Sequence, residues 1–102
     1  MGISVSLQDG RGNEIEVIHD VRNVLHRVLP TRDDSKYCCA NTIDWYGDTT
    51  FNQYQTVLLR REWSILIKNA QDCETRALLE KIDSLLLRCE SGDLKYVKFI
   101  GD

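Results

Sequence analysis

The start of the chain alternates between apolar and polar side chains, and this pattern limits the fold more than any other feature. Ile3, Val5 and Leu7 alternate with polar residues, and the alternation resumes over 14–18 after a segment rich in turn-forming residues. A period of two is typical of β-strands with one face buried and the other in water. Residues 3–18 therefore predict an antiparallel hairpin, and the domain must contain a sheet.

A short helix and a third strand are expected next. Four apolar residues recur at helical spacing after Asp20, whose side chain can cap a helix: Val21, Val24, Leu25 and Val28. Pro30 ends this pattern, which predicts a helix over 21–29. The aromatic, small and β-branched residues of 37–45 favour a third strand. A tight turn over 46–48 follows it, where Gly47 would allow a positive φ.

Two longer helical stripes fill the second half of the chain. The first consists of Leu59, Trp63, Leu66 and Ala70, with Ile67 beside them, and the second of Leu78, Ile82, Leu85, Leu86 and Cys89. Thr49, Thr50 and Asn52 are alternative N-caps for the first helix, which should end near Asn69. Asp72 can cap the second helix, and Gly92 suits a left-handed C-terminal end. Because the link over 69–72 is short, the two helices should be antiparallel neighbours.

A final strand over 94–100 completes the expected architecture. The element order is then ββαβααβ. We predict a single α+β domain spanning 1–102, with a four-stranded, mainly antiparallel sheet and helices packed on one face.

Composition and charge narrow the classes of function. The chain has 13 basic and 16 acidic residues, a formal net charge of −3. An acidic balance disfavours nucleic-acid binding, which depends on neutralising phosphates. The apolar runs are too short to span a bilayer, and no secretory signal is visible, so we expect a cytoplasmic protein without a membrane-spanning segment. Neither the partner nor the oligomeric state can be read from these features.

The cysteines and histidines form no known catalytic or metal-binding motif. Cys38, Cys39, Cys73 and Cys89 contain no C-x-x-C pair, and the expected state is four free thiols, with Cys73 and Cys89 as small helix hydrophobes. No nucleophile elbow, zinc-protease motif or phosphate-binding loop occurs. No catalytic residue, metal or cofactor is therefore predicted, and a non-enzymatic role is favoured.

The segment Asp44–Asn52 is the best candidate for a contact site. Trp45 and Tyr46 are residue types that anchor protein interfaces, and Asp44 and Asp48 could supply polar specificity. The competing interpretation places the rings in the core, more so for Trp45 than for Tyr46. We therefore expect a protein that binds a protein partner through this corner, for example an immunity-type or other accessory protein.

A small enzyme or metal-binding domain is the alternative. Asp44 and Asp48 flank the predicted turn, and His19 could join them as a ligand or proton carrier. A triad of Cys39, His19 and Asp44 also stays open, because triads depend on geometry and not on sequence order.

Four segments resemble a family of small bacterial single-domain proteins with no established activity. They are the opening GISVSLQD, the helical NVLHRVLP, the central IDWYGDTTFN and the closing LKYVKFIGD. The resemblance covers nearly the whole chain. It implies a bacterial origin and residence inside the cell, and it leaves the function open.

Overall fold

The computed structural model describes residues 2–92 and 94–101 and has one open, antiparallel sheet. The strands are β1 (Ser4–Gln8), β2 (Glu14–His19), β3 (Asp48–Phe51) and β4 (Tyr96–Ile100), in the order β2-β1-β4-β3. The predicted hairpin is confirmed, with Asp9 closing its turn by accepting the backbone N–H groups of Arg11 and Asn13. The closing strand lies inside the sheet, between β1 and β3.

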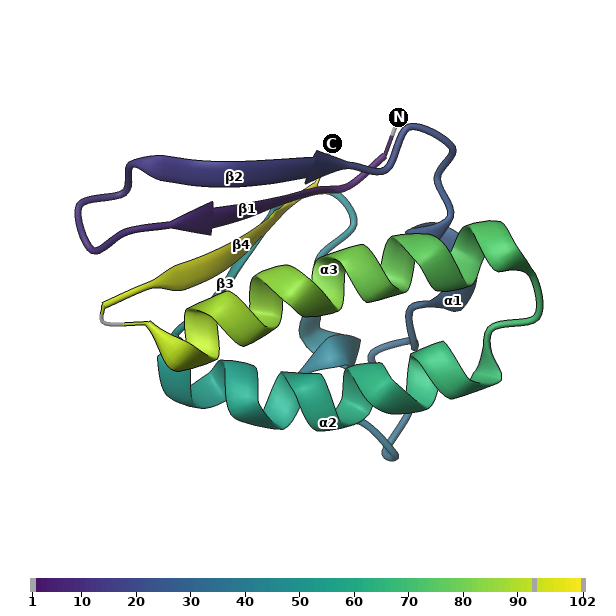
Figure 1. The fold of residues 1–102 in the computed structure, drawn as a ribbon. Coiled ribbons are helices and arrows are strands. Elements are labelled where there is room, and N and C mark those ends of the chain that lie inside the picture. Colours follow the sequence, from purple (N-terminus) through teal and green to yellow (C-terminus); the bar gives the residue numbers. More distant parts are fainter. Residues whose placement is uncertain (1, 93, 102) are drawn as a thin grey trace.

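Helices α2 (Gln53–Asn69) and α3 (Cys73–Ser91) lie side by side on one face of the sheet (Figure 1). α3 contacts β1, β2 and β4, and α2 contacts β3. Of the three alternative caps for α2, Asn52 is the one used, and it forms a reciprocal capping box with Gln55. Asp72 caps α3 as predicted, by accepting the Thr75 N–H. The fold class is thus the predicted α+β arrangement. Among the described residues, no helix is long and apolar enough to cross a membrane.

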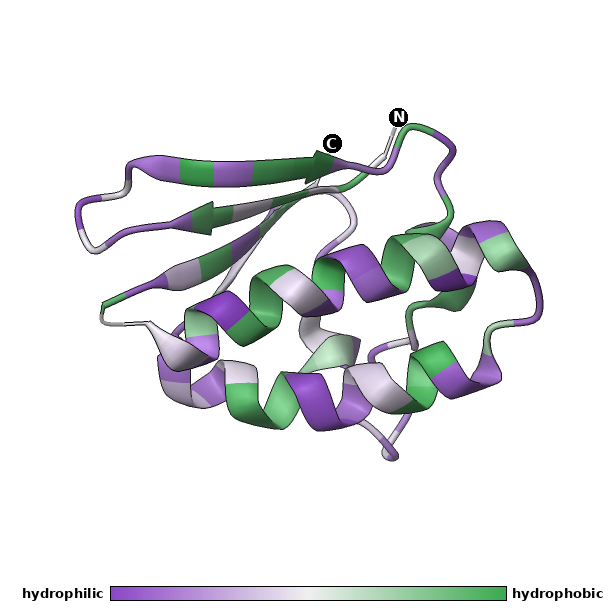
Figure 2. Cartoon of the chain, viewed as in Figure 1, coloured by the Kyte–Doolittle hydropathy of each residue, from purple (hydrophilic) through white to green (hydrophobic). Residues whose placement is uncertain are grey.

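The core lies between the sheet and the α2–α3 pair. Hydropathy colouring shows apolar residues recurring along both helices and the strands (Figure 2). Trp63 is fully buried, packs against Phe99, and donates its indole N–H to the Leu79 carbonyl at 2.9 Å. This bond satisfies the one polar atom of the ring while the ring fills the space between helix and sheet.

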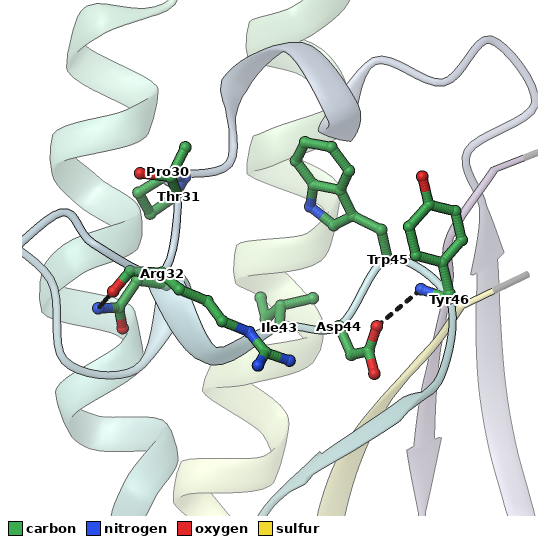
Figure 3. Close-up of a pocket in the computed structure, with 8 residues that line it drawn as sticks. Pro30, Thr31, Arg32, Ile43, Asp44, Trp45 and Tyr46 are labelled. Atoms are coloured by element: carbon green, nitrogen blue, oxygen red, sulfur yellow. Dashed lines mark hydrogen bonds between the residues drawn. The ribbon is translucent and has the colours of Figure 1, made fainter.

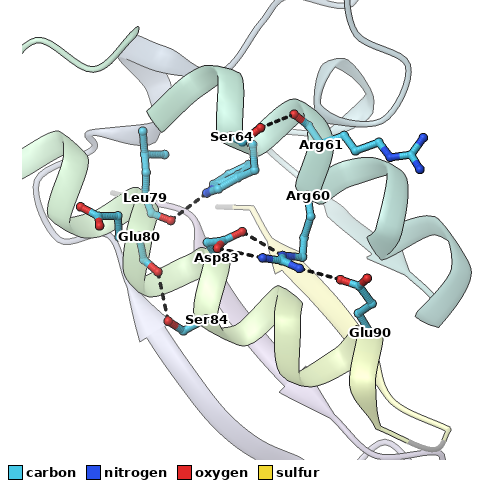
Figure 4. Close-up of polar contacts among 9 residues, drawn as sticks. Arg60, Arg61, Ser64, Leu79, Glu80, Asp83, Ser84 and Glu90 are labelled. Atoms are coloured by element: carbon cyan, nitrogen blue, oxygen red, sulfur yellow. Dashed lines mark hydrogen bonds and ion pairs between the residues drawn. The ribbon is translucent and has the colours of Figure 1, made fainter. Parts of the chain in front are cut away.

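An arginine on α2 joins the two helices on their outer side (Figure 4). Arg60 Nε and Nη2 bind the two Asp83 carboxylate oxygens at 3.1 and 3.3 Å, and Nη1 binds Glu90 at 2.8 Å. The hydrogen bonds that Arg60 donates to Asp83 first, and then to Glu90, raise the pKa of Arg60 above its ordinary value. The guanidinium therefore stays charged, and it links α2 to two carboxylates of α3.

The predicted third strand over 37–45 is wrong. That stretch is irregular except for the 3₁₀ turn η1 (Ala40–Thr42), and the strand instead starts at Asp48, where a turn and the helix start were expected. The Glu62 carboxylate accepts the backbone N–H groups of Cys38, Cys39 and Ala40, so they do not pair with a strand. Thr49 and Thr50 enter the sheet opposite β4, as their β-branched side chains favour.

The predicted first helix is shortened to α1 (Leu25–Val28). Asp20 accepts the N–H groups of Val24 and Leu25, so the helix begins later than predicted. Asn23 has a left-handed φ of 57°, which interrupts the helical stripe and leaves Val21 84% exposed.

Three smaller expectations also fail. Gly92 has φ −96°, so α3 does not end in a left-handed glycine, and Leu94 has φ 50° instead. Gly47 is not among the positive-φ residues. Cys73 is exposed, whereas Cys89 is buried among apolar neighbours as predicted.

Candidate functional site

A pocket of about 320 Å³ opens beside the central aromatic pair (Figure 3). Its wall comes from two stretches that are apart in sequence: Pro30, Thr31 and Arg32 from one, and Asn41, Ile43, Asp44, Trp45 and Tyr46 from the other. Tyr46 is 77% exposed, and Arg32 is exposed as well. The pocket therefore combines aromatic surface with one cation and one carboxylate, a mixture that suits a peptide or side chain better than a purely apolar ligand.

Hydrogen bonds of the backbone N–H groups, to side chains and to one carbonyl, hold the corner of residues 44–47 in place. Asp44 accepts the Tyr46 N–H at 2.9 Å, and the Asp44 N–H is donated to Thr49 Oγ1 at 2.9 Å. The Gly101 N–H bonds the Gly47 carbonyl at 2.7 Å. A Cβ on Gly101 would lie 2.5–2.6 Å from backbone atoms of Gly47 and Trp45, so only glycine fits this close approach. The residue that follows β4 thus holds the corner in place.

The Trp45 ring is shared between core and pocket. It stacks on His26 of α1 with ring centroids 4.8 Å apart, and it packs against the edge of the core while lining the pocket. Two buried polar atoms in this region have no hydrogen-bond partner among the described residues, His26 Nε2 and Asn41 Oδ1. Asn41 Nδ2, by contrast, donates to the Arg32 and Asp34 carbonyls and closes the loop that forms the opposite wall.

The predicted contact residues do not all meet at this pocket. Asp44, Trp45 and Tyr46 line it, but Asp48 does not. Asp48 lies on β3 and pairs with Lys98 of the neighbouring strand at 3.3 Å. Its place is therefore beside the pocket, on the sheet.

The alternative site of two aspartates and a histidine gains no support from the geometry. His19 shares a hydrogen bond with Ser4. The Asp44 carboxylate accepts the Tyr46 N–H within the turn, and the Asp48 carboxylate forms an ion pair with Lys98. Within the described part of the chain, these three do not form a group whose ligand atoms lie within 4.8 Å of one another.

Sequence reasoning missed the buried carboxylate of Glu62. It lies on α2, is 8% exposed, and accepts backbone N–H groups from Cys38, Cys39 and Ala40 at 2.8–3.2 Å. A signal was present, because Glu62 falls three residues after Leu59 and four before Leu66, on the apolar stripe of the predicted helix. An acid at such a position must find donors when it is buried.

Hydrogen bonds keep this carboxylate ionised despite its burial. Burial alone would raise the pKa of Glu62, but the backbone bonds from Ala40 and Cys38, the Cys38 thiol and the Cys39 N–H together lower it below its ordinary value. The negative charge therefore belongs to the folded structure at neutral pH.

The two neighbouring thiols respond in the opposite direction. Burial, and then the contacts with Cys38 and Glu62, raise the pKa of Cys39 to about 12. The hydrogen bond to Glu62 is the main cause that raises the pKa of Cys38. Both groups are thus protonated at neutral pH, which makes Cys39 a poor nucleophile and disfavours a catalytic triad built on it.

Comparison of the chain with protein-family models, curated proteins and solved structures gives no match.

Proposed function

We propose that this is a non-enzymatic protein that binds a protein partner through the pocket and corner formed by Arg32, Asp44, Trp45 and Tyr46. The observation that carries the proposal is the exposure of Tyr46, 77%, beside a pocket whose wall includes the Trp45 ring. A large aromatic ring in water next to a concave surface is typical of an interface anchor.

The charges around the pocket support a partner with polar groups of both signs. Arg32 lines one wall and Asp44 the other, and neither forms an ion pair among the described residues. Charged groups at an interface rim favour specificity and the rate of association. Asp48 is already paired with Lys98, so we assign it a smaller part in binding than Asp44.

An immunity-type or other accessory role in the bacterial cytoplasm fits this proposal. The acidic balance of the chain favours a basic partner, and the family resemblance of the central and closing segments implies a bacterial, intracellular setting. A partner gene beside this one would identify the bound protein.

A photo-crosslinking amino acid in place of Tyr46 tests the proposal in the native host. Tyr54 is a matched control, since it is 81% exposed but lies on α2, outside the pocket. We expect one discrete crosslinked protein from position 46 and none from position 54. The identified partner should then lose at least about tenfold in affinity with Tyr46→Ala, which corresponds to about 1.4 kcal/mol.

Comparison of four variants makes the result decisive. Trp45→Ala and Asp44→Ala should also weaken the complex, Asp48→Ala should weaken it less, and Tyr54→Ala should leave it unchanged. Equal affinity of the folded Tyr46→Ala and wild-type proteins for the crosslinked partner would reject the site.

A further inference from the structure

The segment Cys38–Ala40 brings two thiols to the buried Glu62 carboxylate on α2. Cys38 Sγ lies 3.0 Å from Glu62 Oε2 and 3.9 Å from Cys39 Sγ. The two sulfur atoms and a carboxylate oxygen all lie within 4.8 Å of one another. Capping of the loop explains why Glu62 is buried, but it does not require two adjacent thiols.

We propose that Cys38, Cys39 and Glu62 form a binding site for a divalent, thiophilic cation of the Zn²⁺ type. The proposal does not depend on the pocket beside Trp45, and a failure of one leaves the other intact.

The distance between the sulfur atoms fits such an ion. Two sulfurs bound tetrahedrally at about 2.3 Å lie roughly 3.8 Å apart, close to the observed 3.9 Å. The Cys38 sulfur and the Glu62 oxygen must separate by about 0.6 Å to bind the ion at ordinary lengths. Cys38 is exposed, so its side chain has room for this change.

The ion would replace the hydrogen bond between the Cys38 thiol and Glu62. Cys38 Sγ donates to Glu62 Oε2, and loss of that proton frees one oxygen lone pair toward the metal. The backbone N–H bonds to Glu62 stay in place and orient the carboxylate, as supporting hydrogen bonds do in metal sites. Solvent can supply the fourth ligand from the exposed side of Cys38.

Thiols bind such an ion as thiolates, so binding of M²⁺ releases the two thiol protons to solvent and leaves two thiolates, a carboxylate and the ion.

Titration of reduced, tag-free protein with ZnCl₂ tests the site, with a chromophoric chelator as competitor. We expect one ion per chain, a Kd in the micromolar range or tighter, and release of close to two protons per ion at neutral pH. Proton release is measured by calorimetry in buffers that differ in ionisation enthalpy. Co²⁺ as a probe should give thiolate-to-metal charge-transfer absorption.

Two variants distinguish metal binding at this site from metal binding by the other cysteines. Cys38→Ala, at an exposed position, should keep the fold and weaken binding by about 100-fold or more. Cys73→Ala is the matched control, since Cys73 is another exposed thiol, and it should change nothing. Absence of saturable binding, equal affinity in Cys38→Ala, or loss of binding in Cys73→Ala would each overturn the proposal.

Discussion

The sheet with its α2–α3 pair and the connecting segment of residues 20–47 are held by different interactions. The first region consists of long helices and paired strands, in which backbone groups bond one another. The connecting segment has only α1 and η1 as regular structure. Many of its backbone groups form hydrogen bonds with side chains instead, namely those of Asp20, Asn41, Asp44 and Glu62.

This difference places the candidate site on the less regular region. Backbone groups outside helices and strands still need partners, and a few carboxylates and amides provide them. Such a segment can form a pocket, because its shape is not constrained to a helix or strand, while the rigid layer beneath it fixes its position. Both the pocket and the two thiols lie on this segment.

The largest loss of stability is expected from Trp63→Ala, which disrupts the packing of the regular region. The variant removes a fully buried ring and its bond to the Leu79 carbonyl, and it should lower the free energy of unfolding by about 3–5 kcal/mol. Urea denaturation followed by circular dichroism measures the loss. Tyr54→Ala on the exposed face of the same helix should stay within about 0.5 kcal/mol, and comparable losses in both variants would contradict this account.

A smaller and more local effect is expected from Glu62→Gln. The amide keeps one acceptor oxygen but loses the charge and the second oxygen, at a cost of about 1–3 kcal/mol. Hydrogen exchange should quicken mainly at the Cys38, Cys39 and Ala40 amides, whose bonds end on this carboxylate. Uniform quickening across α2 and α3 would show instead that the two regions unfold as one unit.

Acid should weaken the same contacts in the wild-type protein. The pKa of Glu62 lies below its ordinary value of 4.5 in the folded state, so its stabilising effect is complete above that value. The effect is lost as pH falls through the folded pKa. Urea midpoints from about pH 6 to about pH 3 should therefore fall less steeply in Glu62→Gln than in wild type. Parallel curves would exclude Glu62 as a source of the acid sensitivity.

The smallest loss of stability is expected from Arg60→Met. The three charged side chains of the Arg60, Asp83 and Glu90 network are each about 30% exposed, so solvent screens their attraction. We expect a loss of no more than about 1 kcal/mol, smaller still at high salt. A double-mutant cycle with Asp83→Asn measures the pair directly. A coupling above about 2 kcal/mol would mean that the network, and not apolar packing alone, determines how α2 lies on α3.

Local pattern was enough for the opening hairpin and the two long helices. The alternation through Val5 and Leu7 predicted the hairpin, and the stripes around Trp63 and Ile82 predicted the two long helices. Asp72 marked the start of the second helix, and Asn52 was one of three alternative caps for the first, because a cap bonds backbone groups only a few residues away. These are short-range interactions, and sequence neighbours reveal them.

The tertiary structure decided the path of the connecting segment and which distant residues complete the two candidate sites. Residues 37–45 have the composition of a strand, but the N–H groups of three of them, 38–40, bond to Glu62, which lies more than twenty residues away in sequence. The Arg32 wall of the pocket likewise meets Trp45 only through the loop that Asn41 closes. Sequence alone determined which segments can bury an apolar face. Which distant carboxylate satisfies an irregular backbone depends on how helices and loops pack, and no local pattern contains that information.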